Sequence, residues 1–281
     1  MILDDIDARP GSATSLLRTI VGVCLRRVGG WISIAGLIDL MDAVGVAPAH
    51  TRTAVSRVKA KGLLLASTID GRPGYALNPD AIPMLERGDR RIFTFRQMAD
   101  GDPWCLLSFS IPEAQRDVRH QLRKRLGWIG CGVVATGLWI CPGFLADEVA
   151  DIVADLGLSE RATLFIADTP RIAGTLADTA RHWWDLDQLA ALHRAFLTSQ
   201  SDALANADGV VTTDSGVTRA SFSRFIRALD QWRILPYLDP GLPPSALPDD
   251  WPGFASVTRF ERITARHAAP AYEFLHAATT S

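Results

Sequence analysis

The most informative stretch of the chain reads His50-Thr-Arg-Thr-Ala-Val-Ser-Arg-Val-Lys-Ala-Lys61 and is followed by Gly62. At about 100° per residue, a helix over this stretch places Ala54, Val55 and Val58 on one face, where they would pack inward. The other side is basic and polar and carries Arg52, Thr53, Ser56, Arg57 and Lys59. Such a helix is typical of the recognition element of a helix-turn-helix, in which arginine reads guanine edges. The simpler alternative is a solvated amphipathic helix.

The residues around this helix complete a DNA-binding pattern. Before it, residues 14–28 have helical spacing and stop at Gly29-Gly30, and Ser33 can cap a second helix that runs to about Val44. After it, two short apolar runs flank Asp70-Gly71, a strong hairpin signal. Three helices and a hairpin predict a winged helix-turn-helix over residues 12–80. Lys61 and Arg72, the latter at the hairpin tip, are then placed to contact DNA as well.

The charge distribution favours the same interpretation. The whole chain has a net charge of -2, but residues 9–72 hold nine basic and three acidic side chains, a local net charge of +6. A basic end on a chain that is otherwise acidic indicates a polyanionic partner such as double-stranded DNA.

Composition excludes several other classes of protein. A chain of 281 residues with 48% hydrophobic residues is globular and long enough for one large domain or for two to three small ones. It has no apolar run long enough to span a membrane and no secretory signal, so we expect no membrane partner. The four cysteines are scattered, which favours reduced, buried thiols and a cytoplasmic protein over disulfides or a metal site.

The remaining chain predicts an α+β protein with further domains. Residues 81–102 are polar and arginine-rich, and we expect a short helix near 81–87 and then a linker. Residues 103–175 follow the order β-α-β-β-α-β, which is ferredoxin-like, with the second and third strands separated by Thr136-Gly137. Residues 176–281 form a helical domain, with helices over 183–198, 218–237 and 256–277 and a proline-rich loop over 239–248.

Signatures of catalysis are missing from the sequence. There is no nucleophile elbow, no His-Glu-x-x-His motif and no phosphate loop, and Gly127-x-x-Gly130-x-Gly132 lies between a helix and a strand, which suits a tight turn. His182 and His193 could meet a carboxylate such as Asp185 or Asp187, but we favour structural roles for both. We therefore expect no catalytic residue, no metal site and no cofactor.

Two segments, residues 181–187 and residues 223–233, could hold a small-molecule effector. Adjacent tryptophans suit a flat apolar ligand, and arginines beside a tryptophan suit the carboxylate or phosphate of an aromatic ligand. Arg227 and Asp230 share a helical face in the second segment. The alternative for each residue is packing or an interhelical salt bridge. The candidate effector-binding residues are Arg181, His182, Trp183, Trp184, Arg224, Arg227, Trp232 and Arg233.

At several places the chain resembles the PaaX-type family, repressors of phenylacetic acid catabolism. The resemblance extends from about Ser15 to Leu275 and is most specific in the proline-punctuated string from Leu238 to Gly253. Other matching stretches are Arg52-Thr-Ala-Val-Ser-Arg57, Lys61-Gly-Leu-Leu, Trp104-Cys-Leu-Leu-Ser, Leu126-Gly-Trp-Ile-Gly-Cys-Gly132, Leu138 to Pro142, and Trp183-Trp-Asp-Leu.

This resemblance implies a cytoplasmic transcriptional repressor that binds palindromic operator DNA as a homodimer. It implies a winged helix, a central domain similar to that of Cas2 nucleases and a C-terminal helical domain. It also implies release by an aryl-CoA thioester such as phenylacetyl-CoA. Family members often carry a histidine and a Tyr-Arg or Arg-Arg pair where this chain reads Asp230-Gln-Trp-Arg233, so a free aromatic or xenobiotic acid is an alternative effector. More remote alternatives are a Cas2-like nucleic-acid-processing enzyme and an acyl-CoA-binding enzyme.

Overall fold

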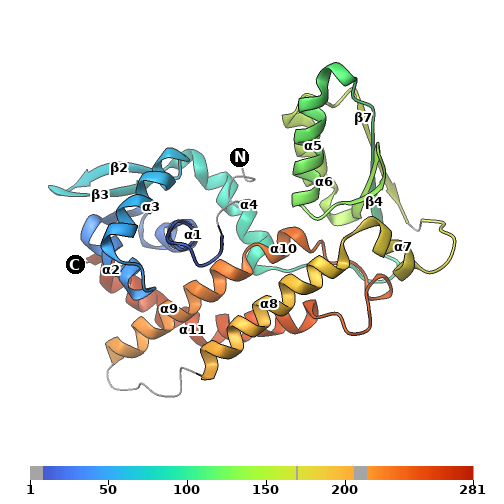
Figure 1. The fold of residues 1–281 in the computed structure, drawn as a ribbon. Coiled ribbons are helices and arrows are strands. Elements are labelled where there is room, and N and C mark those ends of the chain that lie inside the picture. The colour runs from blue at the N-terminus through green and yellow to red at the C-terminus, as the bar shows by residue number, and fades with distance from the viewer. Residues whose placement is uncertain (1–8, 169, 206–213, 281) are drawn as a thin grey trace. The chain divides into compact units, whose positions relative to one another are not determined.

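The computed structural model describes residues 9–168, 170–205 and 214–280 and contains two antiparallel sheets among many helices (Figure 1). The chain divides into two compact units. Unit 1 comprises 1–94, 195–234 and 255–281, and unit 2 comprises 95–194 and 235–254. Residues 176–281, treated above as one helical segment, therefore contribute to both units.

Unit 1 begins with the predicted N-terminal helix. Helix α1 (Ala13–Thr19) starts at Ser12, whose hydroxyl accepts a hydrogen bond of 3.2 Å from the backbone N–H of Ser15. The helical path continues through a π-helical turn (Ile20–Cys24) and a 3-10 turn (Leu25–Val28). Gly29, with φ of 85°, ends it, because glycine takes the left-handed conformation without strain.

The next two helices also follow their local signals. Helix α2 (Ile34–Ala43) begins at Ser33, whose side chain accepts from the backbone N–H of Gly36 at 3.0 Å. Helix α3 (Pro48–Ala60) has the proline in its first turn. Gly62, with φ of 75°, follows its end.

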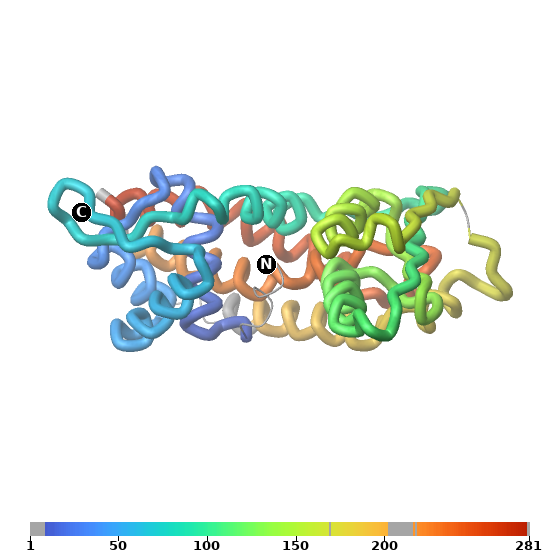
Figure 2. The backbone as a smooth tube through the Cα atoms, turned by 90° about the horizontal axis from the view of Figure 1, so that it is seen from above, coloured from blue at the N-terminus to red at the C-terminus, as the bar shows by residue number. Residues whose placement is uncertain are grey.

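The predicted hairpin is present, but it belongs to a three-stranded sheet. Strands β2 (Leu64–Ile69) and β3 (Arg72–Leu77) are joined through Asp70 and Gly71, with φ of 52° and 74°, the left-handed pair that a type I′ turn needs. Strand β1 (Trp31–Ser33), which we did not predict, pairs with β3 to give the order β1-β3-β2. In Figure 2 this hairpin is the cyan loop at the edge of unit 1.

The segment that follows is more helical than we predicted. Helix α4 (Ile82–Phe93) continues past residue 87 and occupies half of the expected linker. Its last turn is held by long-range contacts: Trp232 donates its indole N–H to the carbonyl of Ile92 at 2.8 Å, and the rings of Phe93 and Phe260 lie 6.4 Å apart. Local sequence gives no sign of either contact.

The rest of unit 1 consists of three helix segments. They are residues 195–205 of α8 (Leu186–Ala205), α9 (Asp214–Trp232) and residues 255–280 of α11 (Gly253–Thr280). Trp232 is fully buried among them and stacks on Phe260 at 4.7 Å between ring centroids. The predicted helix over 218–237 is in fact two, because the chain turns after Trp232 and a short α10 (Leu235–Leu238) follows in unit 2.

Unit 2 contains the predicted β-α-β-β-α-β order. The elements are β4 (Trp104–Phe109), α5 (Arg116–Trp128), β5 (Gly132–Ala135), β6 (Leu138–Pro142), α6 (Ala146–Asp155) and β7 (Ala162–Ala167). The strands are paired antiparallel in the order β5-β6-β4-β7. Helices α5 and α6 lie together beside this sheet (Figure 1), and the shared core contains Leu107 from β4, Leu122 and Leu126 from α5, and Val149 from α6.

A second apolar cluster in unit 2 joins the sheet to α7 (Leu176–Trp183), to the start of α8 and to the proline-rich loop. It contains Met98, Trp104, Trp184, Leu242 and Trp251. The prediction of one helix over 183–198 is wrong at its start: Trp183 ends α7, and Trp184 is extended before α8 begins. The indole N–H of Trp184 donates to the carbonyl of Gly130 at 2.8 Å, which fixes this break. All four cysteines are buried thiols, as expected, and none of them is in a disulfide.

Candidate nucleic-acid interface and effector residues

Helix α3 presents two chemically different faces. Thr51, Ala54, Val55 and Val58 are buried, and this is the inward face that the sequence predicts. The opposite face is open to solvent, and every predicted DNA-contacting residue of this helix lies on it: Arg52, Thr53, Ser56, Arg57 and Lys59. No acidic residue occurs between Asp42 and Asp70, so no carboxylate within this segment offsets the charge.

The hairpin extends this basic surface. Lys61 is exposed at the end of α3, and Lys59 lies 5.9 Å from the ring centre of Tyr75 on β3. Arg72 is exposed at the start of β3, and its guanidinium lies 6.0 Å from the ring of Trp31 on β1. Gly74 on β3 leaves room for the Trp31 indole, because a Cβ atom at this position would lie 2.6 Å from it. The unpredicted strand β1 therefore supports the base of the hairpin.

The predicted effector residues are divided between the two units. Arg181, His182, Trp183 and Trp184 lie in unit 2, whereas Arg224, Arg227, Trp232 and Arg233 lie in unit 1. In unit 2, Arg181 and His182 are exposed, and Trp184 is buried against Trp104. A cavity of about 260 Å³ in this unit is lined by Trp104, Leu176, Asp100 and Asp168 among others, but by neither Trp183 nor Trp184.

In unit 1 most of the predicted residues are occupied by protein groups. The indole of Trp232 is paired with Ile92, as described above. Arg227, which was expected to share a helical face with Asp230, donates to the carbonyl of Val44 at the end of α2. Asp230 pairs with Arg233, at 3.5 Å. Arg224 differs from these three: one of its terminal nitrogens donates to the carbonyl of Gln200 at 2.9 Å, and the other is buried with no hydrogen-bond partner among the described residues.

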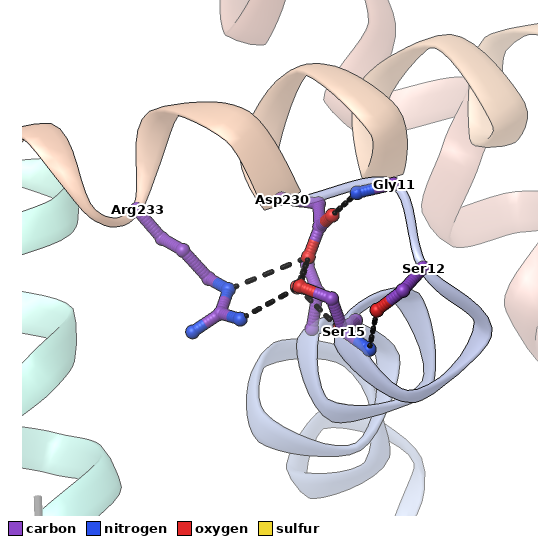
Figure 3. Close-up of polar contacts among 6 residues, drawn as sticks. Gly11, Ser12, Ser15, Asp230 and Arg233 are labelled. Carbon is purple, nitrogen blue, oxygen red and sulfur yellow. Dashed lines mark hydrogen bonds and ion pairs between the residues drawn. The ribbon is translucent and has the colours of Figure 1, made fainter. Parts of the chain in front are cut away.

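Asp230 is the centre of a polar network that sequence reasoning missed (Figure 3). Its side chain is fully buried. One carboxylate oxygen accepts from the backbone N–H of Gly11 at 2.7 Å, and the other accepts from the hydroxyls of Ser15 and Thr19 at 2.6 and 2.7 Å. Arg233 also donates to the Ser15 hydroxyl at 3.0 Å. The network attaches α9 to α1 and leaves no lone buried charge.

Helix α9 is attached to α2 as well. Arg219 donates to the carboxylates of Asp39 and Asp42 at 2.9 and 2.6 Å, and Arg227 reaches Val44. The helix therefore contacts α1 and α2 directly, and these are the helices on which α3 packs. The local signal for the Asp230 network is the pair Ser15 and Thr19, which lie one turn apart on α1.

The proline-rich loop is fixed within unit 2 by a second buried pair. His193 is fully buried, and its Nε2 lies 3.0 Å from a carboxylate oxygen of Asp239. The other oxygen of Asp239 accepts from the backbone N–H of Gly241 at 2.9 Å. His193 thus meets a carboxylate, as the sequence allowed, but the partner is Asp239 rather than Asp185 or Asp187.

Several chemistries find no support among residues 9–168, 170–205 and 214–280. No cluster of three or more His, Cys, Asp or Glu side chains there could hold a metal ion. None of the helices described there has the length and apolarity needed to cross a membrane. Strand β4 ends at Phe109 with no aspartate, which is the residue that the resemblance to Cas2 nucleases would require there.

Comparisons with known proteins agree along the chain. Three family models match it in succession: PaaX-like protein over residues 12–81, the PaaX protein central Cas2-like domain over 97–179, and the PaaX-like protein C-terminal domain over 184–277. The chain is 26% identical over 273 residues to the transcriptional repressor PaaX of Escherichia coli (strain K12), an alignment that covers 96% of this chain and 85% of that protein.

A solved structure also has a similar fold. It is that of the uncharacterized protein Rv0674 from Mycobacterium tuberculosis, with a TM-score of 0.57 and 23% sequence identity. The match covers 93% of this chain and 97% of that chain.

Proposed function

Since this chain belongs to the PaaX family, we propose that it is a transcriptional repressor that binds double-stranded operator DNA through unit 1. The observation that carries the proposal is the exposed basic face of α3 opposite a fully buried apolar face. Together α1 to α3 and the β1–β3–β2 sheet make a winged helix-turn-helix, with α3 as the recognition helix in the major groove.

The contacts divide by chemistry. Arg52, Thr53, Ser56 and Arg57 are proposed to read bases, because arginine can donate two hydrogen bonds to guanine and a hydroxyl can contact either base or phosphate. Lys59, Lys61 and Arg72 are proposed to contact phosphates, which would contribute affinity that falls with salt. A homodimer would present two such helices to the half-sites of a palindromic operator, about 34 Å apart or a multiple of that distance.

The effector is proposed to be an aryl-CoA thioester such as phenylacetyl-CoA, with a free aromatic acid as the alternative. Both carry an anionic group, and Arg224 is the candidate effector residue whose buried donor has no partner among the described residues. Helix α9, which carries Arg224, contacts α1 and α2 through Asp230, Arg227 and Arg219. Binding at Arg224 could therefore change the placement of α3 within unit 1.

The test is fluorescence anisotropy of labelled DNA from the gene's own upstream region, titrated with the purified chain. We expect Arg52→Ala to weaken binding of this DNA by about 1–3 kcal/mol, because a bidentate contact to one base is removed. Arg123→Ala is the matched control, since Arg123 is an exposed arginine on α5 in unit 2. Equal binding by wild type and Arg52→Ala, or no binding at low salt, would contradict the proposal.

The same complex then tests the effector. Phenylacetyl-CoA and phenylacetate are added in separate titrations, and release by one but not the other distinguishes thioester from free acid. If neither compound releases the DNA, the repressor proposal stands and both effectors are removed from it.

A further inference from the structure

The first half of α11, up to its midpoint at His267, and the middle of α9 bring positive charges together in unit 1. Arg224 lies on α9, and Arg259, Arg266 and His267 lie on α11. His267 connects the two helices, because its Nδ1 lies 3.2 Å from the hydroxyl of Ser221 on α9. Arg224 also reaches the backbone of Gln200 on α8. We call Arg224, Arg259 and Arg266 the arginine cluster.

The donors of this cluster are not used up. One terminal nitrogen of Arg224 and one of Arg259 are buried without a hydrogen-bond partner among the described residues. Native proteins pair nearly all buried polar atoms, so two such nitrogens on neighbouring helices require an explanation. Arginine is the side chain best suited to hold a carboxylate or phosphate, because its planar group donates two parallel hydrogen bonds.

Among the described residues, the charges that act on Arg224 and on His267 are also of one sign. Burial lowers the pKa of the Arg224 guanidinium, and the positive charges of Arg259 and Arg266 lower it further. Burial also lowers the pKa of His267, followed by the charges of Arg266 and Arg224. Each charge found to act on these two groups among the described residues is positive, so an anion at the cluster would relieve repulsion and also accept hydrogen bonds from the buried donors.

The cluster is within reach of solvent. Arg266 is exposed, and Arg224, Arg259 and His267 are half-buried, so each presents part of its side chain to water. A ligand could therefore meet the cluster from outside and order the buried donors as it binds.

We propose that the arginine cluster is an anion-binding site that takes a phosphate or carboxylate group. That this anion belongs to the effector rests on the proposed function; that the site binds anions does not. Sequence reasoning singled out Arg224 but neither arginine of α11, because it had no means to place α11 against α9.

The test measures thermal unfolding of the full chain in a phosphate-free buffer. One arm titrates sodium pyrophosphate, a second titrates sodium phenylacetate, and sodium chloride at equal ionic strength is the reference. We expect the midpoint temperature of unfolding to rise with anion concentration above the chloride reference in at least one arm, because a ligand that binds only the folded state stabilises it. The arm that responds distinguishes phosphate from carboxylate.

Variants then locate the site. Arg259→Gln and Arg224→Gln should each weaken anion affinity by about 10-fold or more, which corresponds to the loss of one charge-assisted hydrogen bond. A higher anion concentration is then needed for the same rise in the unfolding midpoint. Arg123→Gln removes the same charge from unit 2 and should respond as wild type. If Arg259→Gln fails to fold, Arg259→Lys keeps the charge, loses the planar fork and should bind more weakly than wild type.

Two results would overturn the inference. The first is that neither anion raises the midpoint above the chloride reference. The second is that Arg259 variants and Arg123→Gln respond alike, which would mean that the anions act through general charge. Since no arm contains DNA, failure of the DNA-binding proposal leaves this test intact, and the reverse also holds.

Discussion

Helix α9 carries two polar groupings that look alike in sequence and differ in structure. At one end, Asp230 and Arg233 are buried with opposite charges, and hydroxyl and backbone donors complete the hydrogen bonds of the carboxylate. Two turns earlier, Arg224 faces further positive charges and has a buried donor with no hydrogen-bond partner among the described residues. A buried network whose charges and hydrogen bonds are all paired is explained by its structural role alone. A group of positive charges with unpaired buried donors is better explained by a ligand that supplies the negative charge.

The largest effect should come from Asp230→Ala. This change leaves Arg233 and three donors buried around an empty acceptor site, and we expect a loss of about 3–5 kcal/mol in the free energy of unfolding. Urea denaturation followed by circular dichroism measures it. Asp151→Ala, at an exposed position on α6, is the control and should cost less than about 0.5 kcal/mol. Similar losses in both variants would show that the network contributes little.

A smaller loss is expected from Ser15→Ala. The Ser15 hydroxyl donates to Asp230 and accepts from Arg233, so its removal should cost about 1–3 kcal/mol of unfolding free energy. In the background of Asp230→Ala the same substitution should cost about 1 kcal/mol less, because the two residues share one network. Urea denaturation of the four proteins measures this coupling. Strictly additive losses would mean that Ser15 and Asp230 act independently.

The arginine cluster should behave in the opposite way. Arg224→Gln removes an unsatisfied, repelled charge, so in chloride we expect the free energy of unfolding to stay within about 1 kcal/mol of wild type or to rise. Arg26→Gln is the matched comparison, because Arg26 donates to Gly22 and Asp89 at 2.9 and 2.7 Å and should lose about 1 kcal/mol or more. A clear loss in Arg224→Gln would show that its charge already has a stabilising role in the free protein.

The contrast also marks how far sequence reasoning reaches. Ser33, Gly62 and the Asp70-Gly71 turn act on their immediate neighbours, and the elements they bound were predicted correctly. Strand β1, the last turn of α4 and the break at Trp184 depend on partners far along the chain, which are Ala76, Trp232 and Gly130 respectively. These elements were missed because periodicity carries no information about distant partners.

The candidate sites divide in the same way. The exposed face of α3 follows from helical periodicity alone, and the structure places each of its predicted residues on that face. The Asp230 network joins residues more than 200 positions apart, and the cluster of Arg224 with Arg259 and Arg266 exists only once α9 and α11 pack together. Their charges can be listed from the sequence, but their pairing cannot.

The smallest predicted effect is a pH dependence centred on His267. Burial and the charges of Arg266 on α11 and Arg224 on α9 lower the pKa of His267 in the folded chain. As the pH falls through the ordinary histidine pKa of about 6.5, the unfolded chain takes up a proton before the folded chain does, so stability decreases with falling pH. Above that pH the residue contributes no slope.

His267→Gln should flatten this decrease, and urea denaturation at about pH 7.5 and 5.5 measures it. His120→Gln, on the exposed side of α5, should keep the wild-type dependence of stability on pH.

Pyrophosphate extends the comparison, because a bound anion would offset the positive charges near His267. It should reduce the loss of stability at low pH in wild type but not in Arg259→Gln. If the free energy of unfolding falls equally with pH in wild type and in His267→Gln, His267 does not sense the charges of the cluster. If pyrophosphate reduces this fall only when Arg259 is present, His267 and the anion site are coupled.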